Sequence, residues 1–377
     1  MKVHITLVGG QPAPVYHGIV ATHPDKVVFV YSEESRQAVE AVKNEIAMTV
    51  DEQEPLDTTN PAEIMLRAET LAERYKDDEV TLNISSGLKS WSHLFGRVFD
   101  PLPNVAVVYM DQNNVLWNYR TMESKSDFVF DMDVQFRLLG NELTHYTPFD
   151  DYTDDDKACL DQIEAARRYN CGTFNKLTTI LSKEWQNNVV NHKTGRLALS
   201  DNEFVEWDQP DFVRLSMKTA KRGVQEFKMF SPHAHSLVFN SGWFEYKIAR
   251  MLSHWRYATN IRLNCVFPDK KSHNVKSPKN EIDIIVNTGT KLLFVECKTK
   301  ISTSTDIDKF RTAVKNYGGL GSKALFVTDI AMNDLQKEKC RESGIIIFSL
   351  QDTAFGPNKE QELFKLLENE LFNINTK

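Results

Sequence analysis

The sequence predicts an α/β protein of two or three domains, with one α/β unit at each end of the chain. Three observations lead to this prediction. Apolar strand patterns alternate with helical patterns up to residue 145, two strand patterns and a turn form a hairpin at residues 281–300, and helix and strand patterns alternate again after it. The chain has 377 residues, of which 41% are hydrophobic, so it is long enough for more than one core. We expect three regions, 1–145, 146–235 and 236–377.

In the N-terminal region, short apolar runs alternate with amphipathic stretches, which is typical of a mostly parallel, doubly wound sheet. The expected strands are Val3–Val8, Lys26–Tyr31, Glu79–Ile84 and Asn104–Met110, and the expected helices are Pro14–Thr22, Glu33–Ile46, Pro61–Tyr75 and Leu88–Phe99. Asn60 before Pro61 is a favourable start for the third helix. Val115–Tyr119 and Phe128–Phe130 predict two added antiparallel strands.

Two loops follow strands of this sheet, at the edge where doubly wound folds bind ligands. The first begins Gly9-Gly10-Gln11-Pro12, and the second is Asn83-Ile84-Ser85-Ser86-Gly87-Leu88-Lys89. Glycine and serine before a helix expose backbone N–H groups to an anion. Neither loop has the dinucleotide-binding or P-loop glycine pattern, and either loop alone is also compatible with an ordinary strand-to-helix turn.

The second loop matches throughout the pattern Asp/Asn-x-Ser/Thr-x-Gly-x-Lys/Arg of the CARF domain, the Rossmann-like sensor of CRISPR-associated proteins, which this region resembles. The resemblance implies that a cyclic oligoadenylate, most commonly cyclic tetra-adenylate, binds across the two-fold axis of a homodimer. Its phosphates would meet the two loops. The ligand-binding residues expected on this basis are Gly10, Gln11, Pro12, Ser32, Ser85, Ser86, Gly87 and Lys89.

Residues 281–300 predict a hairpin that has charged residues on one face. Two apolar runs flank Asn287-Thr288-Gly289-Thr290, and turn formers between two strand patterns signal a hairpin. Strand side chains alternate faces, so Asp283 on the first strand shares a side with Glu296 and Lys298 on the second. Two neighbouring carboxylates favour a cation between them, and oxygen ligands suit Mg²⁺ or Mn²⁺.

An aspartate, then Glu-x-Lys about a dozen residues later, resembles the core motif of PD-(D/E)XK nucleases, with Ile282 in place of the usual proline. That family places a helical glutamate before the hairpin, and Glu245 opens a helical pattern that runs to Trp255. Lys300 is a weaker candidate for a phosphate contact. The resemblance implies that the catalytic residues are Glu245, Asp283, Glu296 and Lys298, and that the three carboxylates hold Mn²⁺ or Mg²⁺.

Each of these signals also has a structural explanation when it is taken alone. Alternating Glu and Lys on an exposed strand form cross-strand charge pairs. A glutamate in the first turn of a helix is favourable because of the helix dipole. The remaining elements follow the order of a PD-(D/E)XK core, with helices at Asp306–Tyr317, Asn333–Arg341 and Glu360–Phe372 and strands at Lys323–Thr328 and Gly344–Leu350.

The middle region begins with an acidic stretch and then predicts two helices, Lys157–Tyr169 and Thr173–Trp185, followed by a hairpin that turns at His192–Arg196. We favour a small helical and hairpin linker between the two end domains. A winged-helix-like unit that binds DNA is the alternative.

The net charge of −7 argues against attraction of the whole protein to nucleic acid, so such contacts must be local. The basic segments 218–222 and 270–279 are candidates. Five scattered cysteines without a C-x-x-C pair make zinc sites and a disulfide framework unexpected. No membrane span or signal peptide is evident, and the cytoplasm is the expected location.

A CARF sensor, a linker and a PD-(D/E)XK domain in this order resemble the cyclic-oligoadenylate-activated nucleases of type III CRISPR immunity. The resemblance implies metal-dependent cutting of single-stranded RNA, single-stranded DNA or both in antiviral defence, with nicking of duplex DNA as a further activity to test. A non-catalytic, nucleotide-sensing regulator that binds DNA is the alternative. A sensor that cleaves its own ligand is a third.

Overall fold

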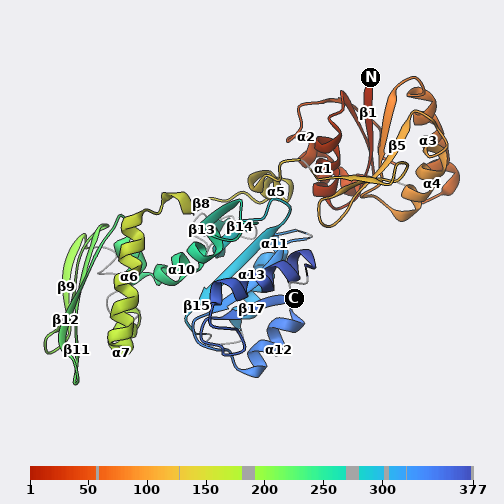
Figure 1. The fold of residues 1–377 in the computed structure, drawn as a ribbon. Coiled ribbons are helices and arrows are strands. Elements are labelled where there is room, and N and C mark those ends of the chain that lie inside the picture. The colour runs from red at the N-terminus through yellow and green to blue at the C-terminus, as the bar shows by residue number, and fades with distance from the viewer. Residues whose placement is uncertain are drawn as a thin grey trace.

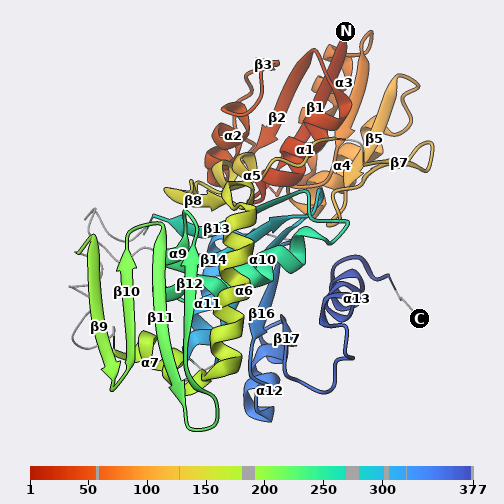
Figure 2. The same cartoon turned by 60° about the vertical axis from the view of Figure 1, so that its left-hand side comes forward.

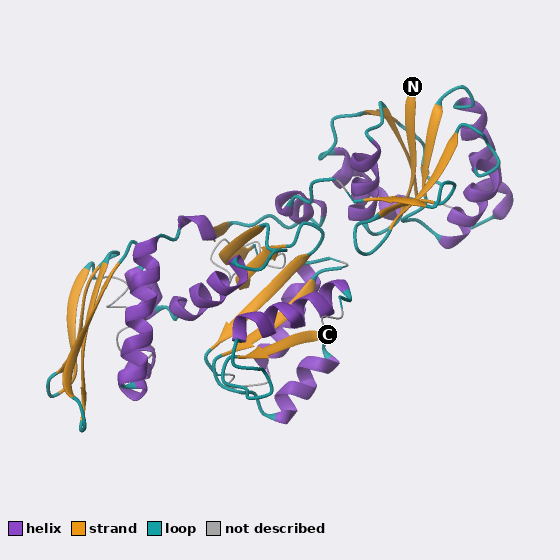
Figure 3. Cartoon of the chain, viewed as in Figure 1, coloured by secondary structure: helices purple, strands orange, loops and turns teal. Residues whose placement is uncertain are grey.

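The computed structural model describes residues 1–56, 59–126, 128–180, 192–268, 280–300, 305–319 and 321–374. The described residues form three sheets that lie in a row, with helices packed around them (Figures 1 and 3). The predicted helix end at Trp185 and the basic segment 270–279 lie outside the described residues. In the described ranges, no helix is both long enough and apolar enough to cross a membrane.

The N-terminal sheet confirms the predicted doubly wound arrangement. Its strand order is β3-β2-β1-β4-β5-β6-β7, and the first five strands in this order are parallel. The strands are β1 (Lys2–Val8), β2 (Lys26–Tyr31), β3 (Thr49–Asp51), β4 (Glu79–Asn83), β5 (Val105–Met110), β6 (Leu116–Asn118) and β7 (Glu123–Lys125). The central strands are nearly continuous apolar runs because both faces of the sheet are covered.

Two pairs of helices cover the two faces of this sheet. α1 (Pro12–Thr22) and α2 (Arg36–Lys43) pack on one face, and α3 (Pro61–Arg74) and α4 (Lys89–Phe99) pack on the other. As predicted, α3 begins after Asn60, whose side chain accepts a hydrogen bond from a backbone N–H of the first turn. The predicted helix from Glu33 is split into a 3₁₀ turn, η1 (Glu33–Ser35), and α2.

The prediction of an antiparallel strand at Phe128–Phe130 is wrong, since the second antiparallel strand is β7. The apolar pattern at Phe130 has another cause. Its side chain is buried in the core of the C-terminal sheet, and its backbone carbonyl accepts a 2.8 Å hydrogen bond from Asn287 Nδ2. The segment therefore connects the two halves of the molecule.

The short helix α5 (Met132–Leu138) lies at the junction between these halves (Figure 1). Its Phe136 packs in the C-terminal core, whereas Val134 packs against α1 and α2. Asp133 forms a two-pronged ion pair with Arg262 of the C-terminal sheet, with N–O distances of 2.5 and 2.8 Å. Packing and charge together fix the N-terminal sheet to the C-terminal half.

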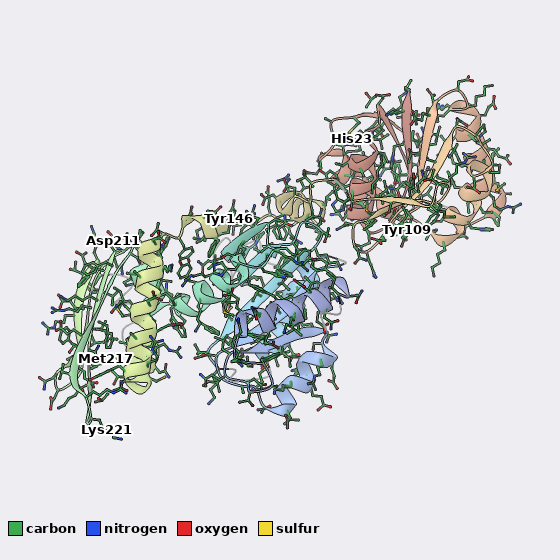
Figure 4. All side chains as sticks on the ribbon, viewed as in Figure 1. His23, Tyr109, Tyr146, Asp211, Met217 and Lys221 are labelled. Carbon is green, nitrogen blue, oxygen red and sulfur yellow. The ribbon has the colours of Figure 1, made fainter. Side chains whose placement is uncertain are left out.

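The middle region contains a second, antiparallel sheet that sequence patterns did not predict in full. Its elements are α6 (Asp154–Tyr169), α7 (Cys171–Ile180), β9 (Thr194–Ser200), β10 (Glu203–Asp208), β11 (Phe212–Thr219) and β12 (Gly223–Phe230). α6 lies between this sheet and the C-terminal sheet (Figures 1 and 2), and one apolar core runs through both. Lys221, in the basic segment 218–222, lies at the tip of the β11–β12 hairpin (Figure 4).

The predicted turn at His192–Arg196 is wrong, because Gly195 and Arg196 lie inside β9. The chain turns instead before β10, at Asn202, which has a φ of 68°. A Cβ at Gly195 would stand 2.2 Å from a ring atom of Trp207, so this glycine serves packing.

The C-terminal sheet has the order β17-β16-β15-β14-β13-β8. Its elements are β8 (His145–Pro148), η2 (Phe149–Asp151), α9 (Ala234–Phe239), α10 (Gly242–Ser253), β13 (Asn260–Phe267), β14 (Asn280–Asn287), β15 (Leu292–Lys298), α11 (Thr305–Tyr317), β16 (Lys323–Thr328), α12 (Asp334–Glu342), β17 (Ile345–Ser349) and α13 (Lys359–Phe372). The predicted order of helices and strands after the hairpin is confirmed, and β8 and β13 were not predicted. The domain boundaries at residues 145 and 235 stay a prediction.

Candidate functional site

The hairpin β14–β15 carries three of the four predicted catalytic side chains at one end and a tight turn at the other. Asn287 pairs with Leu292 beside the turn, and Ile284 pairs with Val295 farther along. Within the turn, Thr288 Oγ1 bonds to both the backbone N and O of Lys291, at 3.1 and 3.0 Å.

At the other end, three side chains from two strands meet. The Lys298 Nζ lies 2.6 Å from Glu296 Oε1 and 3.4 Å from Asp283 Oδ2. The backbone N–H of Cys297 donates to the same Asp283 oxygen at 2.7 Å. The alternation of side chains along the strands thus brings Asp283, Glu296 and Lys298 together, as the sequence predicts.

Burial and crowding of negative charge raise the pKa values of these carboxyl groups. Burial, followed by the charge of Asp283, raises the pKa of Glu296 to about 7. The pKa of Asp283 is raised by burial, against the opposing effects of Lys298 and the Cys297 N–H. Burial lowers the pKa of Lys298, but the two carboxylates outweigh it and raise that pKa above its usual value. Each of these carboxyl groups is therefore harder to ionise here than in water, because it is buried.

Glu245 reaches this cluster from α10. It occupies the first turn of that helix, whose buried face, which includes Phe244 and Ile248, packs in the common core. The pKa of Glu245 is raised well above its usual value by burial first and by Asp283 next. Glu245 and Asp283 are thus electrostatic neighbours. Lys300 is exposed, two residues beyond the end of β15.

The three carboxylates fit a hard cation in charge and in ligand type. Among the residues that the structure describes, no three Asp, Glu, His or Cys side chains stand close enough together to hold a metal ion as they are. The Lys298 ammonium contacts both Asp283 and Glu296, and so supplies positive charge where a cation would. Binding of Mn²⁺ or Mg²⁺ would therefore require this side chain to move away from one carboxylate.

The two predicted ligand loops are in contact with each other. The backbone N–H of Gly9 donates to Ser86 Oγ at 3.0 Å, and Ser85 Oγ accepts from the Met110 N–H at 2.6 Å. Gly87 has a φ of 81°, and a Cβ there would stand 3.0 Å from Leu7. Glycine is needed at this position both for the left-handed conformation and for the close approach to β1.

These loops line a pocket of about 360 Å³. Of the predicted ligand-binding residues, Gly10, Gln11, Ser85, Ser86 and Gly87 line it. Pro12, Ser32 and Lys89 do not contribute to this lining. Pro12 is the buried first residue of α1, Ser32 precedes η1, and Lys89 is exposed at the start of α4.

The pocket also has lining residues that sequence reasoning missed. Tyr109, which Figure 4 labels, lies near the end of β5, another parallel strand, and Asp111, Gln112 and Asn114 follow that strand. The expectation that ligands bind beyond the carboxyl ends of parallel strands therefore applies to these residues too. A second group comes from the C-terminal half, where the sequence has no local signal for it: Thr290, Lys291, Leu292, Gly318, Gly319, Gly321 and Ser322.

No protein-family model matches the sequence, and no curated protein matches it. Solved structures do match. Can2 from Sulfobacillus thermosulfidooxidans, solved in complex with cyclic tetra-adenylate, has 15% sequence identity and a TM-score of 0.69 over 98% of this chain and 99% of that chain. Protein VC1899 from Vibrio cholerae has 16% identity and a TM-score of 0.73 over 98% of both chains.

A third match is a Type III CRISPR defence DNA nuclease activated by cyclic oligoadenylate. It has 15% identity and a TM-score of 0.57 over 97% of this chain and 51% of that chain, so this chain spans about half of its length. At such identities the matches establish a shared fold. The predicted α/β fold class is confirmed at that level: the chain has an N-terminal domain with a doubly wound, mostly parallel sheet and a C-terminal domain with a mixed six-stranded sheet, and it shares this fold over its whole length with Can2 and VC1899.

Proposed function

We propose that this chain is a nuclease that a cyclic oligoadenylate activates and that needs Mn²⁺ or Mg²⁺ to cut nucleic acid. One observation carries the proposal. A single hairpin has an aspartate, a glutamate and a lysine in contact at one end, while its turn lines a pocket between glycine- and serine-rich loops at the other. One matched structure is a complex with cyclic tetra-adenylate and another is a nuclease activated by cyclic oligoadenylate, which supports a ligand of this class for this chain.

In the proposed nuclease site, Glu245, Asp283 and Glu296 would hold the cation. A bound Mn²⁺ or Mg²⁺ would polarise a phosphoryl oxygen and make a bound water more acidic. Asp283 is already fixed by the Cys297 N–H, so its carboxylate needs little reorganisation. Lys298, once displaced from Glu296, would orient the attacking water or stabilise negative charge on the phosphate.

In the proposed sensor, phosphates would meet the backbone N–H groups and hydroxyls of the two loops that contain Gly10 and Ser86. A pocket of about 360 Å³ is at the small end of the range for one drug-sized ligand, roughly 300–1,000 Å³. A ring of four nucleotides therefore needs more than one such pocket. This supports a homodimer in which two chains share one cyclic tetra-adenylate.

For the substrate, we propose single-stranded RNA, single-stranded DNA or both, bound by local contacts since the net charge is −7. The cytoplasm is the expected location. The test is a cleavage assay on labelled single-stranded RNA, single-stranded DNA and supercoiled plasmid. It uses Mn²⁺ or Mg²⁺, with and without cyclic tetra-adenylate, and is paired with light scattering to measure the mass of the particle.

Cutting that needs both ligand and metal, by a particle of twice the chain mass, is the expected result. Binding of cyclic tetra-adenylate or of duplex DNA without any metal-dependent cutting would contradict the proposal and favour the non-catalytic regulator. Shortening of the ligand itself, without cutting of any added nucleic acid, would favour a sensor that degrades its ligand.

A further inference from the structure

The proposed nucleotide pocket is built by both halves of the chain. Loops after β1, β4 and β5 line it from the sensor side, and the turn of the β14–β15 hairpin lines it from the nuclease side through Thr290, Lys291 and Leu292. A ligand in this pocket would therefore stand against the same hairpin that carries Asp283 and Glu296.

Asn114 connects the two sides directly at the pocket. It has a φ of 57° in the turn after β5, a left-handed conformation that asparagine tolerates better than most residues. Its Nδ2 donates a hydrogen bond to the backbone carbonyl of Thr290 in the hairpin turn. The Asn114 side chain thus joins the sensor to the hairpin at the wall of the pocket.

A second set of bonds fixes the direction of this side chain. His17 Nε2 lies 2.6 Å from Gln135 Nε2 and accepts from it, so Nδ1 carries the proton and donates to Asn114 Oδ1 at 2.9 Å. With its oxygen held by His17, Asn114 presents its amide N–H to Thr290. The network spans α1, α5, the turn after β5 and the hairpin.

The hairpin turn itself is held rigidly. Thr288 closes it with two bonds to the backbone of Lys291, and Asn287 Nδ2 donates to the Phe130 carbonyl at the junction. Lys291 Nζ donates at 2.7 Å to the Leu371 carbonyl near the end of α13. If the turn moves, the strands β14 and β15 or the helix α13 must therefore move with it.

Along the strands, the path to the catalytic end is continuous. The pairs run from Asn287–Leu292 to Ile284–Val295, and Asp283 and Glu296 are the next residues on the two strands. At about 3.3 Å per residue, Thr290 and Glu296 are separated by roughly 20 Å of strand. A paired hairpin can transmit a shift over this distance because interiors are close-packed.

We propose that Asn114 is a positioning residue that couples occupancy of the nucleotide pocket to the placement of Asp283 and Glu296, through its hydrogen bond to Thr290 and the β14–β15 hairpin. This inference rests on the proposed function and adds the route of its regulation. A ligand can shift the hairpin only if its interaction free energy differs between two arrangements of the turn. The position of Thr290, Lys291 and Leu292 in the pocket wall supplies such contacts.

The sharpest test is Asn114→Asp. An aspartate keeps the acceptor for His17 and has the same shape, but it places an oxygen opposite the Thr290 carbonyl where a donor stood. Asn113→Asp is the matched control, because this substitution adds the same charge in the same turn. Asn113 is exposed and does not contribute to the pocket lining.

Two readouts are needed. Hydrogen exchange of hairpin amides, with EDTA present, should slow on addition of cyclic tetra-adenylate in the wild type and in N113D but not in N114D. The cleavage rate at saturating ligand should fall in N114D by at least about fivefold, the lower end of typical coupling factors. Wild-type protection and wild-type saturated cleavage in N114D would overturn the inference.

A second variant acts from outside the pocket. Thr288→Val removes the two hydrogen bonds that the Thr288 side chain makes with the backbone of Lys291 and keeps the side-chain volume, while the 2.9 Å bond from the Thr288 N–H to the Lys291 carbonyl remains. Thr288 is buried and does not line the pocket. The dissociation constant for cyclic tetra-adenylate should stay within about twofold, while saturated cleavage falls by at least about fivefold. Unchanged saturated cleavage in T288V would also count against the route. If the wild type neither binds cyclic tetra-adenylate nor cuts nucleic acid, the proposed function itself is wrong. If the ligand activates the wild type and all variants equally, the proposed function stands and only the coupling through Asn114 is wrong.

Discussion

The backbone N–H of Cys297 donates a 2.7 Å hydrogen bond to Asp283 Oδ2, which ties the carboxylate of β14 to the strand that carries Glu296 and Lys298. The donor of this bond is a main-chain group, so changing the side chain of Cys297 leaves the donor in place. The nearby Lys298 ammonium approaches the same oxygen at 3.4 Å. The Asp283 carboxylate is therefore held by a main-chain donor as well as by an ammonium. The property of Asp283 to test is its charge.

Asp283→Asn should abolish metal-dependent cleavage while leaving the fold intact. The amide oxygen can still accept from the Cys297 N–H, but the negative charge that attracts a cation is lost. We expect the cleavage rate to fall by at least about 100-fold, or roughly 2.7 kcal/mol of activation free energy. Glu281→Gln is the control, because Glu281 is exposed two residues earlier on the same strand. Similar losses in both variants would show that only the charge of the strand matters.

Lys298→Met should make the protein depend on a divalent cation for stability. Without the ammonium that lies 2.6 Å from Glu296 and 3.4 Å from Asp283, the two carboxylates repel each other. We expect the melting temperature in EDTA to fall, and Mn²⁺ to raise it more in K298M than in the wild type. Thermal unfolding with and without Mn²⁺ measures this. Lys300→Met, which removes an exposed lysine beyond the strand end, should leave both values unchanged.

The β14–β15 hairpin was predictable because its signal is local. Two strands, a turn rich in Asn, Thr and Gly, and the alternation of faces are enough to place Asp283 beside Glu296. The helix that carries Glu245 was predictable for the same reason, since its apolar face repeats at helical spacing.

The middle sheet and the far wall of the pocket were not predictable in this way. Gly195 suggested a turn, but its lack of a side chain makes room for Trp207 on the neighbouring strand, and sequence spacing does not distinguish these two uses. Thr290 and Gly319 line the pocket only because α5 fixes the two halves together. Contacts of this kind depend on tertiary packing.

Ser86→Ala should weaken ligand binding without affecting the metal site. Its hydroxyl accepts from the Gly9 N–H at 3.0 Å and so holds together the two loops that line the pocket. Loss of one such bond costs about 1 kcal/mol, so we expect the dissociation constant for cyclic tetra-adenylate to rise by roughly five- to tenfold. Titration calorimetry measures the change. Ser90→Ala in the exposed first turn of α4 is the control, and equal affinities for both variants would contradict the role of Ser86.

Two buried histidines should make the N-terminal half sensitive to acid. Burial lowers the pKa of His4 to about 3 and, acting against the Asn114 hydrogen bond, that of His17 to about 4. In the unfolded chain both titrate near 6.5. Below that pH the unfolded state binds protons that the folded state does not. Each histidine therefore lowers the free energy of unfolding by about 1.4 kcal/mol per pH unit, until the pH reaches its folded pKa.

His17→Gln separates this effect from the titration of carboxylates. Glutamine can accept from Gln135 and donate to Asn114, but it does not bind a proton in this range. Between pH 6 and 4.5, the free energy of unfolding from urea titration should fall less steeply with decreasing pH in H17Q than in the wild type. The difference in slope should approach about 1.4 kcal/mol per pH unit. His23→Gln, at an exposed histidine just after α1 (Figure 4), should keep the wild-type slope. A wild-type slope in H17Q would mean that His17 is protonated in the folded protein, and the acceptor role of its Nε2 toward Gln135 would then be wrong.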